Sequence, residues 1–149
     1  SLTHIILGQL GIGDAYMFVL YTGLGVVLGH NFPFYMQFKG GKGIAASGGM
    51  IVGLWDWRLV VILLAAFIIS VVITRYVSVG SLTIMIGFFI LYTVFAIHGD
   101  YNFTSNAKMI EGIIMAGIIA GMAVIRHWQN IKRLIAGTEN KLSFGSKKA

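Results

Sequence analysis

The chain has 149 residues, of which 57% are hydrophobic and only 11% are charged. Soluble domains carry about 25% charged residues, so this composition excludes an ordinary soluble domain and favours a protein that is covered by lipid. The absence of cysteine from the sequence excludes a disulfide framework, a thiolate metal site and a cysteine nucleophile. The chain starts at Ser1 and lacks a basic region followed by an apolar one, so we expect no signal peptide in it.

Five apolar stretches approach the length of a membrane helix. They cover residues 15–28, 44–55, 59–74, 81–97 and 109–125. A crossing helix needs roughly 20 residues, so several stretches reach that length only with their flanks. The second is only about 18 Å long as a helix and is too short to cross unless it borrows loop residues. A glycine-broken apolar stretch, 5–12, precedes them. We expect an all-α, polytopic membrane protein with about five transmembrane segments, forming a single domain over residues 1–149.

The basic residues are distributed unequally between the loops. If all five segments cross, one side of the membrane receives only Arg58 and Lys108. The other side receives nine cations: Lys39, Lys42, Arg75, Arg126, Lys132, Arg133, Lys141, Lys147 and Lys148. The positive-inside rule assigns this second side to the cytoplasm. The same alternation puts the loop around residues 39–43 and the tail after Arg126 on one face, where they can meet.

A glycine-rich, doubly basic loop follows the first long apolar segment. It reads Lys39, Gly40, Gly41, Lys42 and Gly43. Glycines allow successive backbone N–H groups to point toward one anion, and the start of the next helix adds its unpaired N–H groups. The loop is no Walker A motif, because glycine stands where Ser or Thr should follow the second lysine. We expect a phosphate site; the alternative is a loop whose lysines only set topology and touch anionic headgroups.

The tail after the last apolar segment is polar and basic. As a helix it would carry His127, Asn130 and Leu134 along one face. The cations Arg126, Lys132 and Arg133 are suited to phosphate or to anionic headgroups, and a basic tail that only binds lipid remains the alternative. His30 ends the first long segment beside the glycine loop and is either a general acid–base or a polar anchor.

The positions of the acidic residues predict structural roles rather than catalytic ones. Asp14, Asp56 and Asp100 stand at segment ends as loop caps, and Glu111 has a local partner in Lys108. No pair of histidines has metal-ligand spacing with carboxylates. We therefore expect no metal site and no cofactor.

Loop and tail together resemble the motifs of the acyl-phosphate:glycerol-3-phosphate acyltransferases, the PlsY family of bacterial membrane enzymes. Residues 29–46 match the second family motif, G-H-x-x-P-x-F-x-x-F-K-G-G-K-G-V-A-T, with Tyr35, Ile44 and Ala46 in place of its phenylalanine, valine and threonine. The third motif is similar to residues 126–134, followed by Gly137, Glu139 and Lys141. The resemblance covers nearly the whole chain.

The resemblance implies a specific reaction and site. Members transfer a fatty acyl group from acyl phosphate to the 1-hydroxyl of sn-glycerol 3-phosphate, giving lysophosphatidic acid and phosphate. The motif residues that carry over as the glycerol 3-phosphate site are Lys39, Gly40, Gly41, Lys42 and Gly43. The third motif implies that His127 and Asn130 matter for activity and that Glu139 matters for integrity. We add His30 as a candidate catalytic residue and Arg126, Lys132 and Arg133 as candidate phosphate ligands.

The resemblance also defines what we expect of partners and location. The substrates would be glycerol 3-phosphate and acyl phosphate, the protein would lie in the bacterial cell membrane with its site loops facing the cytoplasm, and no nucleic acid would be bound. The acyl chain would lie among residues 15–28, 59–74, 81–97 and 109–125. Protein partners cannot be inferred.

One family feature has no counterpart in the sequence. Members have about seven membrane helices and a first motif, similar to G-S-G-N-x-G-A-T-N, that supplies a serine and a nearby arginine. We therefore expect that the chain lacks the N-terminal helix and first motif of the family and is inactive alone. Two other classes stay open from the residues themselves: a carrier for a phosphorylated anion, which could use a glycine–lysine nest, and a scaffold subunit whose basic face binds anionic lipid.

Overall fold

The computed structural model describes residues 14–143, and helices are the only regular elements in that range. They are α2 (Ala15–Asn31), η1 (Phe34–Met36, a 3-10 turn), α3 (Ile44–Gly53), α4 (Trp57–Thr74), α5 (Val77–Ile97), α6 (Asn106–Arg126) and α7 (Trp128–Ile135). The expected all-α fold is confirmed. The apolar stretch at residues 5–12 and the lysines at 147 and 148 lie outside the described residues.

Four helices of the described part are long and apolar enough to cross a membrane: α2 with its extension to Met36, α4, α5 and α6. The remaining apolar helix, α3, has ten residues, or about 15 Å, against a hydrocarbon core of about 30 Å. Residues 44–55, which the sequence indicated were too short to cross, therefore contain a short helix in the structure. Four crossing helices and one shorter apolar helix account for the five predicted segments.

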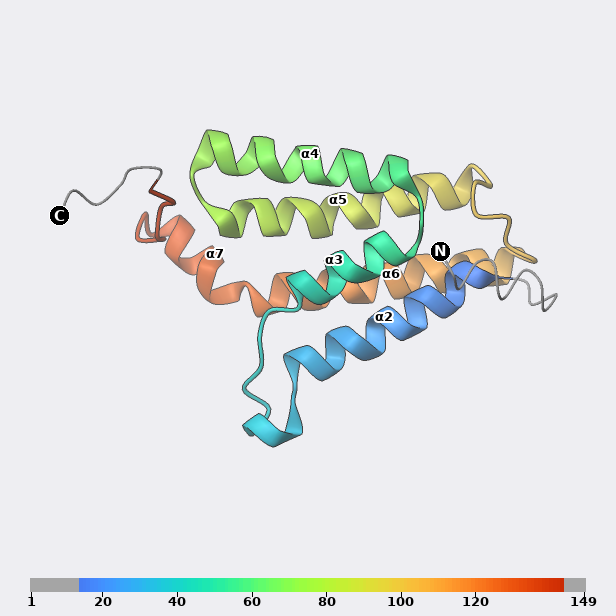
Figure 1. The fold of residues 1–149 in the computed structure, drawn as a ribbon, viewed down its shortest axis with the longest axis horizontal. Helices are drawn as coiled ribbons and strands as arrows, with labels where there is room; N and C mark the ends of the chain where they lie inside the picture. Colours follow the sequence, from blue (N-terminus) through green and yellow to red (C-terminus); the bar gives the residue numbers. More distant parts are fainter. Residues whose placement is uncertain (1–13, 144–149) are drawn as a thin grey trace.

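The long helices lie side by side in the order α4, α5, α6 and α2, and α3 packs against α2, α4 and α5 (Figure 1). Buried side chains between them form the core, including Leu20, Leu54, Phe88, Tyr92 and Ile119. The outward face of α4 is apolar and exposed, for example at Ile69 and Ile73. This is the arrangement expected where lipid, not water, covers the bundle.

Side-chain caps set two of the helix starts. Asp56 Oδ1 accepts from the backbone N–H of Arg58 at 3.1 Å at the start of α4, and Ser105 Oγ accepts from the N–H of Lys108 at 3.3 Å at the start of α6. Such caps satisfy N–H groups that have no partner within the helix. The predicted pair is also confirmed, since Lys108 Nζ lies 2.9 Å from Glu111 Oε2.

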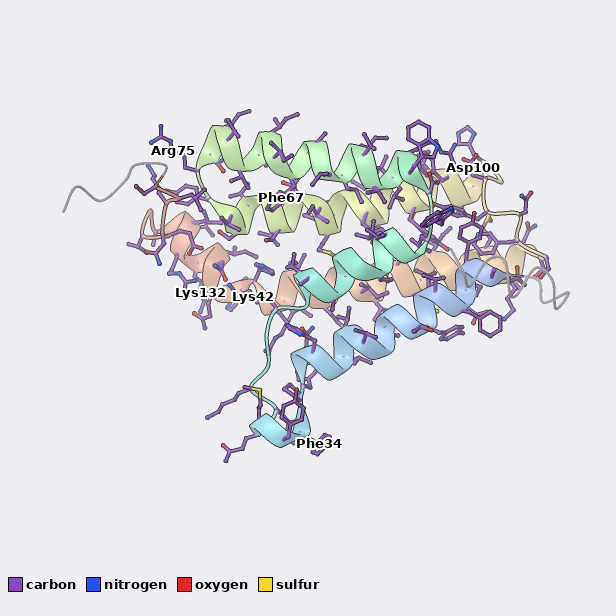
Figure 2. The ribbon with its side chains drawn as sticks, viewed as in Figure 1. Phe34, Lys42, Phe67, Arg75, Asp100 and Lys132 are labelled. Carbon is purple, nitrogen blue, oxygen red and sulfur yellow. The ribbon has the colours of Figure 1, made fainter. Side chains whose placement is uncertain are left out.

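The two ends of the bundle differ in charge. Figure 2 shows Lys42, Arg75 and Lys132 toward one end and Asp100 at the other. The glycine loop and α7 both belong to the basic end (Figure 1). The folded chain therefore brings the two basic motifs to the same end of the membrane helices.

Candidate active site

A cavity of about 730 Å³ opens where the basic ends of the helices meet. Its lining comes from five parts of the chain: His30 at the end of α2; Lys42, Gly43, Ile44 and Ala45 at the start of α3; Phe67 of α4; Val77, Ser78 and Ser81 of α5; and His127, Asn130 and residues 139–142 of the tail. The loop motif and the tail motif thus face one space, although more than eighty residues separate them.

Two glycines of the loop are required by its geometry. Gly43 has a φ of 78°, a left-handed conformation that favours glycine. Gly40 lies against the backbone, so that a Cβ there would overlap the carbonyl oxygen of His30 and lie 2.7 Å from that of Asn31. The loop is therefore folded tightly onto the last turn of α2.

The start of α3 leaves backbone donors free. Its N-cap is Gly43, which has no side chain to cap the helix, and the first helical bond runs from Ser47 N to Gly43 O at 2.8 Å. The N–H groups of Ile44, Ala45 and Ala46 precede that bond and have no carbonyl partner in the helix. Ile44 and Ala45 line the cavity, and with the positive end of the helix dipole and Lys42 they form a corner that is suited to an anion, the anion-binding corner.

His127 is buried at the junction of α6 and α7, with 2% of its surface exposed. Its Nδ1 lies 2.7 Å from the carbonyl oxygen of Ala123. A carbonyl only accepts, so Nδ1 carries the proton and Nε2 of the neutral ring is an acceptor. Burial lowers the pKa of His127 from its usual 6.5, and the nearby Lys42 lowers it further. The ring is therefore neutral at pH 7 and able to accept a proton.

A second group of polar side chains is organised around Glu139. Its Oε1 accepts from Asn130 Nδ2 at 2.7 Å and from Ser78 Oγ at 2.9 Å, and its Oε2 accepts from Arg133 Nε at 2.7 Å. The bond from Asn130, opposed by burial and supported by Arg133 and Ser78, lowers the pKa of Glu139 to about 2. Asn130 Oδ1 is buried without a hydrogen-bond partner among the described residues. It is a free acceptor on a residue that lines the cavity.

The remaining predicted residues lie outside the cavity lining. Among the described residues, Lys39, Gly40, Gly41, Arg126, Lys132 and Arg133 are not part of it. Arg126 donates to loop carbonyl groups, Lys132 Nζ lies 5.3 Å from the ring centre of Trp128, and Arg133 is paired with Glu139. Their roles toward phosphate stay predictions.

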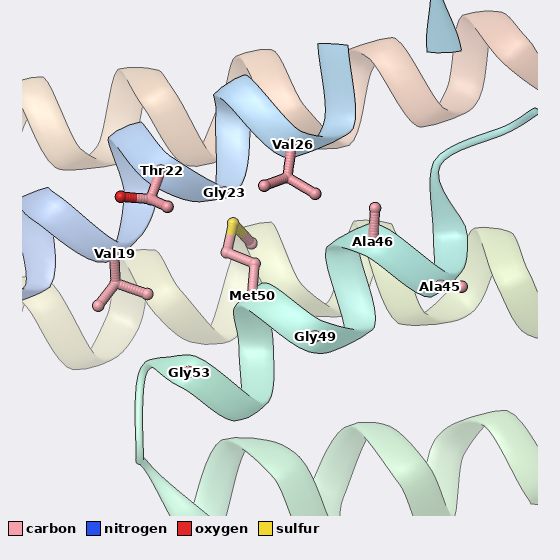
Figure 3. Close-up of a pocket in the computed structure, with 9 residues that line it drawn as sticks. All are labelled: Val19, Thr22, Gly23, Val26, Ala45, Ala46, Gly49, Met50 and Gly53. Atoms are coloured by element: carbon pink, nitrogen blue, oxygen red, sulfur yellow. The ribbon is translucent and has the colours of Figure 1, made fainter. Parts of the chain in front are cut away.

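A second, apolar groove of about 380 Å³ runs between α2 and α3. Small residues make room for it, and Met50 of α3 points toward Gly23 of α2 across it (Figure 3). Ala45 lines both the groove and the larger cavity. The apolar groove therefore starts beside the anion-binding corner.

Sequence reasoning missed two contributors to the site, Ser78 and Ser81. The expected segment began at residue 81, whereas α5 begins at Val77 and presents both hydroxyl-bearing residues to the cavity. Serine is common where membrane helices pack closely, so the two residues gave no distinctive signal in the sequence.

The chain matches known proteins over most of its length. A model of the glycerol-3-phosphate acyltransferase family matches residues 2–137. The glycerol-3-phosphate acyltransferase of Chlorobaculum tepidum is 37% identical over 139 residues, covering 86% of this chain and 60% of that protein. That of Thermoanaerobacter pseudethanolicus is 40% identical over 123 residues, covering 83% of this chain and 56% of that protein. The chain spans about six tenths of the length of the curated relatives it matches.

A solved structure has the same arrangement of helices. It is the crystal structure of PlsY (YgiH), an integral membrane glycerol 3-phosphate acyltransferase, in its glycerol 3-phosphate form. The match has a TM-score of 0.73 at 29% identity and covers 95% of this chain and 64% of that chain. The lysophosphatidic acid form of that protein matches with a TM-score of 0.71. The chain belongs to the glycerol-3-phosphate acyltransferase family of integral membrane proteins.

Proposed function

We propose that the cavity is the site of acyl transfer from acyl phosphate to the 1-hydroxyl of sn-glycerol 3-phosphate. The observation that carries the proposal is the meeting of Lys42 and the free N–H groups of α3 with the neutral ring of His127 in one cavity. Lys42 and the N–H groups suit a phosphate group, and the neutral ring of His127 can accept a hydroxyl proton. Family membership and the glycerol 3-phosphate form of the matching crystal structure support the same acceptor substrate.

The phosphate of glycerol 3-phosphate would bind at the start of α3. Backbone N–H groups and the helix dipole supply directional donors there, and Lys42 adds a full positive charge. Arg133 balances the charge of the Glu139 carboxylate, and Asn130 and Ser78 donate hydrogen bonds to it, so it offers little repulsion to a bound anion.

The reaction needs positioning more than a strong nucleophile. The 1-hydroxyl oxygen attacks the acyl carbonyl carbon, a new ester C–O bond forms, and the bond from that carbon to the phosphate oxygen breaks. His127 Nε2 takes the hydroxyl proton, and inorganic phosphate leaves with the bonding electron pair. Acyl phosphate is already an activated anhydride, so alignment and charge stabilisation supply most of the catalysis. His30 also lines the cavity and is a second candidate for the proton.

The acyl chain would lie in the groove between α2 and α3. The groove is apolar and joins the cavity at Ala45, so a chain whose carbonyl carbon lies at His127 has an apolar path into the membrane. The acyl chain would then contact α2, which is one of the four segments expected to hold it, and α3, which is not one of them. The protein would lie in the bacterial cytoplasmic membrane with the basic end in the cytoplasm, by the positive-inside rule.

The first test is binding of glycerol 3-phosphate to the purified chain in detergent, measured by calorimetry against glycerol as a ligand without phosphate. We expect binding that depends on the phosphate and that Lys42→Ala weakens. No binding, or binding that this variant leaves unchanged, would refute the proposed site.

The second test follows lysophosphatidic acid formed from labelled glycerol 3-phosphate, with acyl phosphate and acyl-CoA of one chain length as rival donors. We expect product only with acyl phosphate, and only when a second polypeptide carrying the first family motif is co-expressed. Product formed by the chain alone would contradict the need for that motif. Equal use of acyl-CoA would contradict the proposed donor.

A further inference from the structure

Arg126 is the last residue of α6, and its side chain contacts both the glycine loop and the residue that follows α2. Its Nη2 donates to the carbonyl oxygens of Gly40 at 2.8 Å and Gly41 at 2.9 Å, and its Nε donates to Gly41 at 3.1 Å. Its guanidinium carbon lies 5.2 Å from the ring centre of Phe32, directly after α2. One side chain therefore ties the end of α6 to the end of α2 and to the glycine loop.

These bonds fix the direction of two peptide groups. In a planar trans peptide the C=O and the following N–H point in opposite directions. The Gly40 carbonyl points to Arg126, and the following N–H, that of Gly41, donates to the carbonyl oxygen of His30 at 3.1 Å. The Gly41 carbonyl also points to Arg126, so the Lys42 N–H points away from it. That N–H has no backbone acceptor among the described residues, and Lys42 lines the cavity whereas Arg126 does not.

The guanidinium also changes the charge that the loop presents. Two carbonyl oxygens turned toward the cavity would repel a phosphate, and here a cation holds them away from it. Two of the three guanidinium nitrogens are occupied by loop carbonyl groups and one face of the group is covered by Phe32. This geometry suits a residue that holds the loop rather than one that contacts phosphate.

We propose that Arg126 is a positioning residue, which holds the Gly40 and Gly41 carbonyl groups so that the Lys42 amide faces the bound phosphate. The inference rests on the proposed function, because it assigns the residue a part in glycerol 3-phosphate binding. It differs from the expectation that Arg126 is itself a phosphate ligand, since positioning acts on the loop before any ligand is bound.

The test is hydrogen–deuterium exchange of the ligand-free chain in detergent, read by mass spectrometry on peptides covering residues 38–44. In Arg126→Gln we expect these amides to exchange about tenfold faster, and the affinity for glycerol 3-phosphate to fall about tenfold or more. Arg126→Lys keeps the charge but cannot donate through a planar fork to both carbonyl groups, so we expect faster exchange there too. Arg75→Gln removes an exposed arginine at the same end of the bundle and should leave both readouts unchanged.

Each outcome decides a different point. Unchanged ligand-free exchange in both Arg126 variants would overturn the proposal, and a fall in affinity without a change in exchange would make Arg126 a direct phosphate ligand. A wild-type chain that binds neither glycerol 3-phosphate nor inorganic phosphate would refute the proposed function. The exchange of the loop would still decide whether Arg126 positions it. An equal effect of Arg75→Gln would reduce the result to net charge and overturn the proposal.

Discussion

Asn130 Nδ2 donates a 2.7 Å hydrogen bond to Glu139 Oε1 and thereby joins the first turn of α7 to the segment that follows it. The chain turns back at the end of α7, where Thr138 N donates to Arg133 O at 2.8 Å, and this brings the carboxylate to Asn130. The bond fixes the amide, so that Asn130 Oδ1 is the free acceptor. Glu139 therefore orients the Asn130 amide and also lines the cavity itself.

We predict that Glu139 makes the stability of this region depend on pH. Its pKa is about 2 in the folded protein against an ordinary 4.5, so folding favours the charged form. The stabilisation is complete above the ordinary pKa and is lost as the pH falls toward 2. Thermal unfolding followed from about pH 7 to about pH 3 should show a falling melting temperature in the wild type.

Glu139→Gln is the matched variant for this prediction. It keeps the shape of the side chain but removes the charge that meets Arg133. We expect a lower melting temperature than the wild type at neutral pH and a flatter dependence on acid pH. Parallel pH curves for the two proteins would show that another carboxylate controls acid stability.

Lys42 and Lys39 are predicted to differ although they belong to the same motif. Lys42 lines the cavity and Lys39 does not. Removing a charged hydrogen-bond donor from a phosphate should cost about tenfold to a hundredfold in affinity. Lys42→Ala should therefore weaken the binding of glycerol 3-phosphate to the chain and raise its KM when the polypeptide carrying the first family motif is co-expressed. Lys39→Ala should change either quantity by less than about fivefold, as expected of an exposed charge. Equal effects of the two variants would argue against the anion-binding corner at α3.

The sequence was sufficient to predict the helices and the meeting of the two motifs at one end of the bundle. Apolar length identified all five segments, and the alternation of loops brought Lys42 and His127 to one end. The sequence was not sufficient to predict which groups the long basic side chains contact. Arg126, Lys132 and Arg133 were predicted as phosphate ligands, and that prediction stays untested, but the sequence did not indicate that they also contact loop carbonyl groups, an indole ring and a carboxylate. Such choices depend on which elements pack nearby, and residue spacing does not record that packing.

The apolar groove could not be predicted for the same reason. The small residues of α3, such as Ala46 and Gly49, signal close packing of helices, but only the packed structure shows that α2 and α3 leave a space between them. The start of α4 was more predictable, because Asp56 was expected as a cap and accepts a local bond there.

Gly40→Ala should damage the loop more than Gly41→Ala. A Cβ on Gly40 would overlap the backbone oxygen of His30, which cannot move without shifting α2. A Cβ on Gly41 would meet the ring of His30, an exposed side chain that can rotate away. We expect Gly41→Ala to weaken the binding of glycerol 3-phosphate and Gly40→Ala to abolish it. Gly29→Ala is the control, because a Cβ there meets no atom within 4 Å; equal loss of binding in this control would contradict the steric argument.

Gly49→Leu should shorten the acyl chain that the site accepts. Gly49 lines the groove between α2 and α3, and a Cβ there meets no atom within 4 Å, so a leucine would occupy the groove without disturbing the helices. Gly48 has the same open surroundings but does not line the groove, which makes Gly48→Leu a matched control. The measurement is the transfer rate with acyl phosphates of increasing chain length, in the presence of the co-expressed polypeptide that carries the first family motif. A preference that stays the same in Gly49→Leu, or shifts equally in Gly48→Leu, would exclude this groove as the acyl site.

We predict that protonation of His127 lowers the transfer rate at acid pH. Its Nδ1 is committed to the Ala123 carbonyl, so only Nε2 is left to take the hydroxyl proton, and it does so only while the ring is neutral. Burial lowers the pKa of His127 below 6.5. With the polypeptide carrying the first family motif co-expressed, the rate should therefore be constant near neutral pH and fall tenfold per pH unit at pH values below that lowered pKa, which is the acid limb of the pH–rate profile. His127→Gln should lose this limb together with most of kcat, and should keep its affinity for glycerol 3-phosphate because the phosphate contacts lie on α3. An acid limb that persists in His127→Gln would move the proton acceptor to His30, whose ring lines the same cavity from the end of α2.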